Sequence, residues 1–486
     1  TGANNTSVGF SALCTNTTGA TNVAVGCGAL LINTTGANNT ALGAKALCSN
    51  VEASSNTAVG VESLCSNTTG TKNVGVGLNS LRKVTTGSCN VGIGTSAMQN
   101  GLTGSDNTAV GTGALQTSST GASNVAIGHG ALQANTSASA NVAVGKSALV
   151  ANTTGANNVA IGNAMETNTT GANNVAVGGG ALQANTTASG NTGIGRIALA
   201  SNTTGANNVG VGFCVLRTNT TGAGNTSVGA CSLCHNTTAA NNTAVGLCAL
   251  HENTTGHSNV AVGQGALDAN TTANQNTAIG ADALTTATTA GSNTAIGHDA
   301  LKATTTGGQN NAFGDGAMVA NTTGCRNVAM GNGVMFKNTE GECNTALGHT
   351  ALACNTTGDN NTAIGHQALK ASTTASGNTA VGTDALDSNT TGSSNTGVGW
   401  GVLQTNTTGS SNIAIGRNSL YVNTTGAQNT SIGVESLDAN TTANDNTAVG
   451  FASLGATTTG HSNVAIGRDS MLGNLTGDGN TALGYK

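Results

Sequence analysis

A unit of 17 residues repeats along the whole chain, and this period limits the fold more than any other feature of the sequence. A glycine that follows an apolar residue marks each copy, first at Gly9 and then every 17 residues up to Gly162. One residue is missing before Gly178, after which the 17-residue steps continue to Gly484, so there are 29 copies. We therefore expect one continuous repeat region, 1–486, which is a segment of a longer chain.

The length and the residue pattern of the repeat predict short strands. Seventeen residues are too few for a pair of helices, which needs more than about 30, and no apolar stripe with the period of a helix is present. A typical copy reads Asn, then Thr or Val, then Ala, then Val or Ile, then Gly. β-Branched residues bounded by glycine are typical of strands. One such strand cannot bury its own apolar side, but copies stacked about 4.8 Å apart can. The absence of proline agrees with strands that use every backbone N–H. The sequence thus predicts an all-β fold, a parallel β-solenoid of about 29 coils.

One position of the unit is always asparagine. It lies four residues before the repeat glycine in all 29 copies. We expect these side chains to stack as a ladder of amides, each hydrogen-bonded to the copies above and below. The predicted ladder includes Asn5, Asn22, Asn39, Asn56, Asn259 and Asn480.

The strand divides the unit into two faces, because alternate residues point to opposite sides. In the second copy Val23 and Val25 share one side, and we expect them to form the coil interior together with Leu30. The other side carries only Asn, Ala, Ser or Gly in every copy, so we expect other chains to pack closely against it. The alternative is that small residues are needed only to fold a narrow coil. The predicted packing face includes Ala24, Gly26, Ala41, Gly43, Ala261 and Gly263.

The core of the unit also carries a resemblance. Residues 158–162 and 463–467, both Asn-Val-Ala-Ile-Gly, resemble the head repeats of trimeric autotransporter adhesins, which form a trimeric parallel β-roll from a repeat of near 14 residues. The whole unit resembles repeat regions of tail-fibre-like proteins of bacteriophages and giant viruses. The resemblance implies a homotrimer in an extracellular place, on a virion or a cell surface.

The composition offers little for catalysis, nucleic acid or membranes. Charged residues make up 7% of the chain and the net charge is −5, so no electrostatic attraction to nucleic acid or an anionic membrane is expected. No apolar run is long enough for membrane insertion. Recognised nucleophile, phosphate-binding and zinc motifs are missing, and carboxylates do not pair at any one position of the unit. We expect no enzyme, no cofactor and no metal site.

The 12 cysteines include some at equal positions of successive copies. Cys48 and Cys65 lie five residues after the repeat glycine, and Cys214, Cys231 and Cys248 lie two residues after it. A coil spacing of about 4.8 Å falls within the Cα separation that a disulfide spans, so a stacked ladder of disulfides or thiols is expected. The alternative is that small thiols fill a niche which Ala or Ser fills elsewhere.

Two other positions draw attention. Large side chains gather just after the repeat glycine, either as an exposed contact rib or as tolerated surface variation, and the rib would contain Phe10, Phe213, Trp400 and Phe451. Asn-Thr-Thr occurs 17 times at one position, each time as a formal N-glycosylation signal. Glycans at the coil spacing would clash, so we expect a turn in which these side chains bond local backbone.

Three functions remain open at this point. The first is a structural fibre or shaft, a rigid spacer that associates with itself as a homotrimer or as an end-to-end filament. The second is an adhesin-type module whose repeat surface contacts a host-surface glycan or matrix protein. The third is ice binding by rows of threonine, which is disfavoured because the two threonines are adjacent and point to opposite sides.

Overall fold

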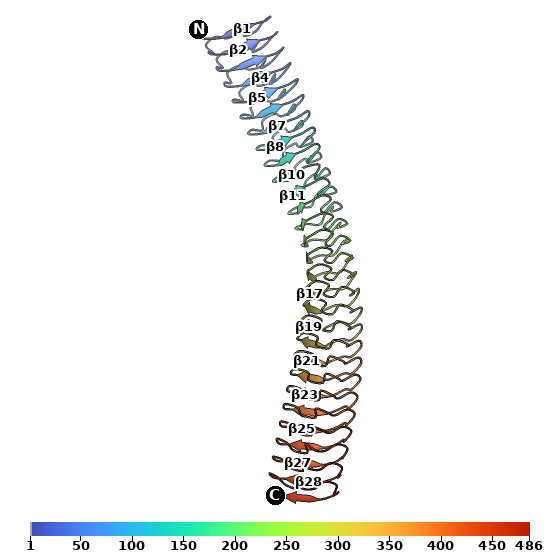
Figure 1. Cartoon of the computed structure of the whole chain (residues 1–486). Coiled ribbons are helices and arrows are strands. Elements are labelled where there is room, and N and C mark those ends of the chain that lie inside the picture. The colour runs from blue at the N-terminus through green and yellow to red at the C-terminus, as the bar shows by residue number, and fades with distance from the viewer. Residues whose placement is uncertain (1) are drawn as a thin grey trace. The chain divides into compact units, whose positions relative to one another are not determined.

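The computed structural model describes residues 2–486 and confirms an all-β parallel β-solenoid with a repeat of about 17 residues (Figure 1). Each repeat contributes one strand of three residues, and residues 2–486 contain no helix. The chain divides into two compact units. The first ends at Asn241 and the second runs from Asn242 to Lys486, and each is a stack of the same coil.

The strands follow the repeat throughout. The first unit contains β1 (Thr6–Val8), β2 (Val23–Val25), β3 (Thr40–Leu42), β4 (Thr57–Val59), β5 (Val74–Val76), β6 (Val91–Ile93), β7 (Thr108–Val110), β8 (Val125–Ile127), β9 (Val142–Val144), β10 (Val159–Ile161), β11 (Val175–Val177), β12 (Thr192–Ile194), β13 (Val209–Val211) and β14 (Thr226–Val228). The second contains β15 (Thr243–Val245), β16 (Val260–Val262), β17 (Thr277–Ile279), β18 (Thr294–Ile296), β19 (Asn311–Phe313), β20 (Val328–Met330), β21 (Thr345–Leu347), β22 (Thr362–Ile364), β23 (Thr379–Val381), β24 (Thr396–Val398), β25 (Ile413–Ile415), β26 (Thr430–Ile432), β27 (Thr447–Val449), β28 (Val464–Ile466) and β29 (Thr481–Leu483).

Successive strands within a unit pair in parallel and in register. Thr6 lies beside Val23 and Val8 lies beside Val25, so each position of the unit meets the same position of the next coil. Two kinds of backbone hydrogen bond flank the strand: the N–H of Val23 donates to Asn39 O at 2.8 Å, and the N–H of Gly26 donates to Val8 O at 2.8 Å. A row of equal side chains therefore runs along each unit at every position of the repeat.

Two turns complete the coil and are also bonded from coil to coil. At the first turn the N–H of Leu13 donates to Ala29 O at 2.9 Å, and at the second the N–H of Thr17 donates to Thr34 O at 2.9 Å. Each coil is thus joined to its neighbour at three places around its outline. Through these contacts the buried backbone N–H and C=O groups of the turns find hydrogen-bond partners, although the fold has no helices to supply them.

The interior of the coil is the opposite of the predicted one. Ala24 and Leu30 are fully buried, whereas Val23 is 38% exposed and Val25 is half-buried on the outside. The expectation that Val23 and Val25 line the core is therefore wrong. So is the expectation that the alanines face another chain, because Ala41 and Ala261 are fully buried like Ala24.

The thickness of the coil explains this reversal. Gly397 occupies the centre of β24, and a Cβ atom placed there would lie 3.0 Å from Leu386 Cδ1 and 3.1 Å from Val402 Cγ1. The first turn, which contains Leu13 and its equivalents and which we call the leucine turn, packs directly against the strand. It leaves room only for Gly, Ala or Ser at the central position of the strand. A β-branched residue fits only on the outer side of the strand.

The repeat glycines, which include Gly26, Gly43 and Gly263, are small for a different reason. Gly26 has a φ of +135°, and a Cβ atom there would lie 2.6 Å from Gly43 O in the next coil. Gly263 has a φ of +139°, and its Cβ would overlap the carbonyl oxygen of Gly280. The next coil of the same chain, not another chain, demands glycine at this position.

Candidate functional site

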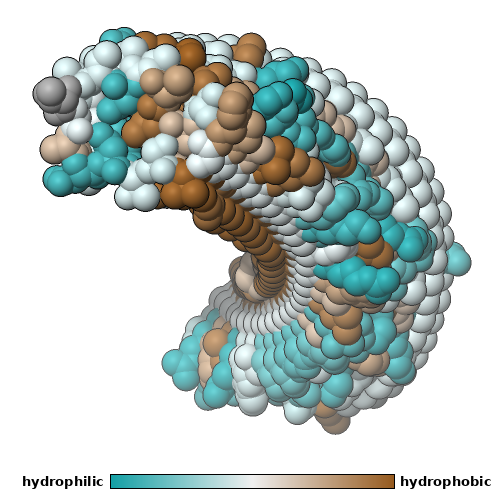
Figure 2. Space-filling model, turned by 90° about the horizontal axis from the view of Figure 1, so that it is seen from above, coloured by the Kyte–Doolittle hydropathy of each residue, from teal (hydrophilic) through white to brown (hydrophobic). Residues whose placement is uncertain are grey.

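The first and third residues of every strand point outward, and we call the surface that they form the strand face. Its third position is apolar in all 29 strands. Ile161 in the first unit and Ile466 in the second are each 42% exposed. Figure 2 shows the apolar residues as a brown row that runs from coil to coil. Exposed apolar surface of this regularity is typical of a surface that another molecule covers.

The strand face carries no charge. Its first position is Thr, Val or Ile in each strand except at Asn311, and no Asp, Glu, Lys or Arg occurs at either outward position. The charged groups lie on the turns instead, where Arg82 pairs with Glu62 at 2.8 Å. Charged groups are therefore kept away from a surface that is partly exposed, which favours an uncharged partner.

The invariant asparagines lie behind the strand face and hold each strand to the next coil. Asn22 Nδ2 donates to Gly36 O at 2.9 Å, and Asn22 Oδ1 accepts the N–H of Asn39 at 2.9 Å. The same backbone contact recurs along both units, and examples are Asn5 Oδ1 with the N–H of Asn22 (2.8 Å), Asn39 Oδ1 with the N–H of Asn56 (3.0 Å), Asn242 Oδ1 with the N–H of Asn259 (2.9 Å) and Asn463 Oδ1 with the N–H of Asn480 (2.9 Å). These side chains therefore bond mainly the backbone of the neighbouring coil, and in some coils a bond between the amides is added, as from Asn90 Nδ2 to Asn73 Oδ1 at 3.1 Å.

A second row of buried asparagines belongs to the Asn-Thr-Thr segments. Asn33 Nδ2 donates to Asn16 Oδ1 in the preceding coil at 3.0 Å and to Gly36 O at 3.0 Å. Sequence reasoning found the turn but missed this row, although the shared 17-residue position was a signal for it. Because Asn33 is fully buried, its amide has no room for a glycan in the folded chain.

The threonines of the same segments are not equivalent. Thr34 Oγ1 donates to Val51 O in the next coil at 3.1 Å, whereas the Thr35 side chain is exposed. The two threonines therefore form one row that binds the next coil and one row that faces solvent.

Cys48, Cys65, Cys214 and Cys231 are free thiols in the structure. Cys48 Sγ lies 2.8 Å from Cys65 Sγ, so the structure brings this pair together. Cys214 is buried, and burial raises the pKa of its thiol. The neighbouring Cys231 raises this pKa further. Cys248 lies in the second unit and is half-buried.

The aromatic side chains of the predicted rib are all exposed, with Phe10 at 81%, Phe213 at 47%, Trp400 at 52% and Phe451 at 44%. They do not form a continuous rib within either unit. Phe10 follows β1 and Phe213 follows β13, and the coils of β25 and β26 separate Trp400 from Phe451. Guanidinium groups cover two of the rings, with Arg196 6.0 Å from the Phe213 centroid and Arg468 5.3 Å from that of Phe451.

Comparison with known proteins adds no relative. The sequence matches no protein-family model and no curated protein. Among residues 2–486 no helix has the length and apolar character that crossing a bilayer requires. The strand face, which has no counterpart among the sequence expectations, is the feature that most needs a functional explanation.

Proposed function

We propose that this chain is a structural fibre protein of a virion or a cell-surface appendage, and that copies of it associate through their strand faces. The observation that carries the proposal is the strand face itself, which is apolar at its third position in every coil and free of charge at both positions. In this role the chain acts as a rigid extracellular spacer, because each coil is bonded to the next at three places.

The period of the strand face favours a second copy of the same chain as its partner. Apolar side chains recur at the coil spacing, about 4.8 Å. A partner with another spacing loses register after a few coils, whereas a copy of this chain keeps it along a whole unit. Homo-oligomers also prefer closed symmetry, in which the same face of each copy meets around an axis.

The number of copies follows from the resemblance of the Asn-Val-Ala-Ile-Gly core to trimeric adhesin heads, which favours three. The proposed interface differs from the one expected at first, because Ala24 and Ala41 point into their own coil. Burial of the outward Val and Ile side chains would supply the apolar area that a thin coil with an alanine and leucine interior lacks.

The test is the native mass of the purified chain, by light scattering on a size column and by native mass spectrometry. We expect three times the chain mass of 46.6 kDa. A variant with Val398→Lys, Ile415→Glu and Ile432→Lys should dissociate into single chains, because these residues lie on consecutive strands and are 37%, 39% and 38% exposed. The alternating signs prevent repulsion between neighbouring coils.

The matched control places the same three charges on an exposed turn, with Thr391→Lys, Thr408→Glu and Thr425→Lys. This variant should keep the native mass of the unmodified chain. A monomeric unmodified chain would overturn the proposal, and the strand face would then be a binding surface for another molecule. A very large and polydisperse mass that the strand-face variant retains would instead indicate end-to-end filaments.

A further inference from the structure

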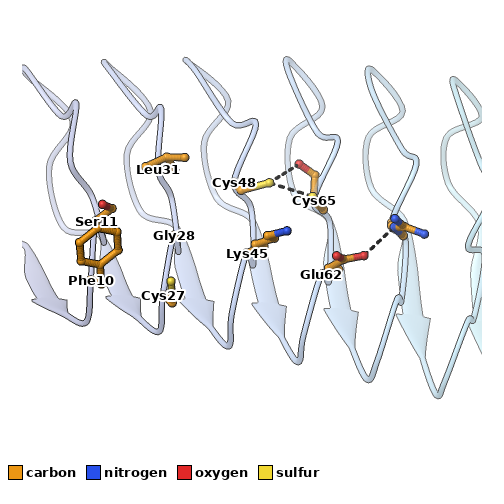
Figure 3. A pocket seen from close by; sticks show the side chains of 10 residues that line it. Phe10, Ser11, Cys27, Gly28, Leu31, Lys45, Cys48, Glu62 and Cys65 are labelled. Carbon is orange, nitrogen blue, oxygen red and sulfur yellow. Dashed lines mark hydrogen bonds and ion pairs between the residues drawn. The ribbon is translucent and has the colours of Figure 1, made fainter.

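Two cysteines on neighbouring coils of the first unit meet beside a hollow in the surface (Figure 3). Cys48 follows β3 and Cys65 follows β4, and their sulfur atoms lie 2.8 Å apart. Cys48 Sγ also lies 3.4 Å from the backbone oxygen of Cys65. Both thiols are free and half-buried, so they are shielded in part but open to a small molecule.

The hollow has a volume of about 480 Å³ and a mixed lining. Phe10 and Leu31 form its apolar wall. Lys45, which lies on the same coil as Cys48, brings an ammonium group to the hollow. Glu62 and Arg82 also line it, but they pair with each other at 2.8 Å. The lining suits a small organic molecule with an apolar stem and an anionic group.

The two thiols differ in acidity. The hydrogen bond between the two thiols lowers the pKa of Cys48 to about 6, against the opposing effect of burial and with help from Ser49 and Lys45. The same hydrogen bond, together with burial, raises the pKa of Cys65. The Glu62 carboxylate raises this pKa further, and Arg82 lowers it. The opposite directions of the two pKa shifts make Cys48 the more acidic thiol of the pair.

We propose that Cys48 and Cys65 form a dithiol site that reacts with small organic disulfides, with Cys48 as the attacking thiolate and Cys65 as the resolving thiol. Cys48 Sγ attacks one sulfur of the disulfide, forms a mixed disulfide and releases the other half as a thiolate. Cys65 then loses its proton to the released thiolate and attacks Cys48 Sγ, which expels the second half as a thiolate. The dithiol is oxidised by two electrons, and the small disulfide is reduced to two thiols.

The product is a disulfide that joins the coils of β3 and β4. Parallel coils spaced by about 4.8 Å hold the Cα atoms of stacked residues within the range that a disulfide spans, so the bond forms without moving the backbone. The site does not depend on the proposed fibre function, because it involves a turn of one chain and not the strand face.

The experiment treats the full chain with oxidised glutathione, blocks the remaining thiols with N-ethylmaleimide, and identifies the tryptic peptides by mass spectrometry. Residues 46–72 form one tryptic peptide that contains Cys48 and Cys65 and no other cysteine. We expect this peptide to lose two hydrogens and to carry neither glutathione nor N-ethylmaleimide. The exposed Cys89, alone in peptide 84–146, is the internal standard and should react more slowly.

Two variants separate the roles of the thiols. Cys65→Ser should stop at the mixed disulfide, with one glutathione on Cys48, and Cys48→Ser should leave Cys65 free for N-ethylmaleimide. Circular dichroism of both variants verifies that the solenoid is intact. The proposal is overturned if peptide 46–72 never closes, if Cys48 reacts no faster than Cys89, or if Cys48→Ser accumulates glutathione on Cys65.

Discussion

Buried asparagine at a fixed position of the repeat has a cost wherever its row is interrupted. In the second row each Nδ2 donates to the Oδ1 of the preceding coil, so every Oδ1 needs an asparagine in the coil that follows. Four asparagines of this row lack that neighbour, and their Oδ1 atoms are buried without a hydrogen bond: Asn67, followed by Val84, Asn270, followed by Ala287, Asn355, followed by Ser372, and Asn440, followed by Thr457. An unpaired buried acceptor destabilises the coil in which it lies.

The first prediction is that Ser372→Asn stabilises its coil. Ser372 is fully buried, and a new Nδ2 there would donate to Asn355 Oδ1 and to Ala375 O, as Asn355 itself does with Asn338 and Gly358. The next coil has Asn389 at this position, so the new Oδ1 gains a donor in turn. We expect a local gain of about 1 kcal/mol, so amide hydrogen exchange in peptides that cover 355–375 should be about fivefold slower. Hydrogen exchange is the suitable measurement because a long repeat array need not unfold in a single step.

The control for that prediction is Ser372→Val, since valine already occupies the equivalent position at Val84. This variant adds volume without a donor and should not slow exchange by the same factor. If Ser372→Asn exchanges as fast as Ser372→Val, then the unpaired oxygen of Asn355 has no energetic consequence.

At the scale of the element, the strand and its turns depend on backbone conformations that few residues adopt. The repeat glycine ends each strand with a positive φ, near +130° except at Gly162, where it is +92°, and only glycine adopts such values readily. Leu30 enters the turn with a φ of +49°. A left-handed conformation disfavours leucine by about 1–2 kcal/mol. Full burial of that side chain, about 1.5–3 kcal/mol, offsets this strain.

The second prediction contrasts two glycines of the second unit. Gly280 has a φ of +139°, and a Cβ there would overlap the carbonyl oxygen of Gly297 and lie 2.6 Å from its carbon. Gly280→Ala should therefore weaken the local structure by about 2–3 kcal/mol or more and speed hydrogen exchange of β17 and β18.

Gly333 provides the comparison for this prediction. Its φ is +60°, a Cβ there would lie 3.7 Å from Thr350 Cγ2, and Asn79 and Asn418 adopt the same conformation at the equivalent position. Gly333→Asn should change local stability by no more than about 0.5 kcal/mol. Equal effects of the two substitutions would show that coil stacking does not restrict the repeat glycine.

The same elements show how far sequence reasoning reaches. The period, the strand type and a fully buried Leu30 could be predicted, because they follow from spacing and composition. The inward side of the strand could not, because alternation shows which residues share a face but not which face is inside. The usual preference for buried Val and Ile failed at Val23, since the leucine turn leaves space only for small residues. The spacing also predicted that Cys48 and Cys65 stack, but the hollow beside them depends on side chains of several coils, which spacing does not give.

For the whole molecule, the coil is an interchangeable part. The copy between Gly162 and Gly178 is one residue short, yet Val159 still pairs with Val175 and Ile161 with Val177. The missing residue comes from the exposed stretch after Gly162, and Met165 remains fully buried in the turn. The stack therefore tolerates a change in an outer turn as long as the strand, the leucine turn and the asparagine rows stay aligned.

The third prediction follows from this modular construction. Deletion of residues 400–416 removes one full repeat and joins Gly399 to Arg417, which places Thr396 beside Thr430 and Val398 beside Ile432. Interfaces between neighbouring coils then remain of the same kind, so we expect unchanged circular dichroism and unchanged hydrogen exchange in β23 and β27.

Deletion of residues 400–407 removes about half a repeat and moves Asn412 out of the buried row, which leaves its former partners unpaired. That variant should lose protection from exchange on both sides of the cut. If the two deletions are equally damaging, stability depends on the particular sequence of each coil, and if they are equally harmless, it does not depend on the register of the rows.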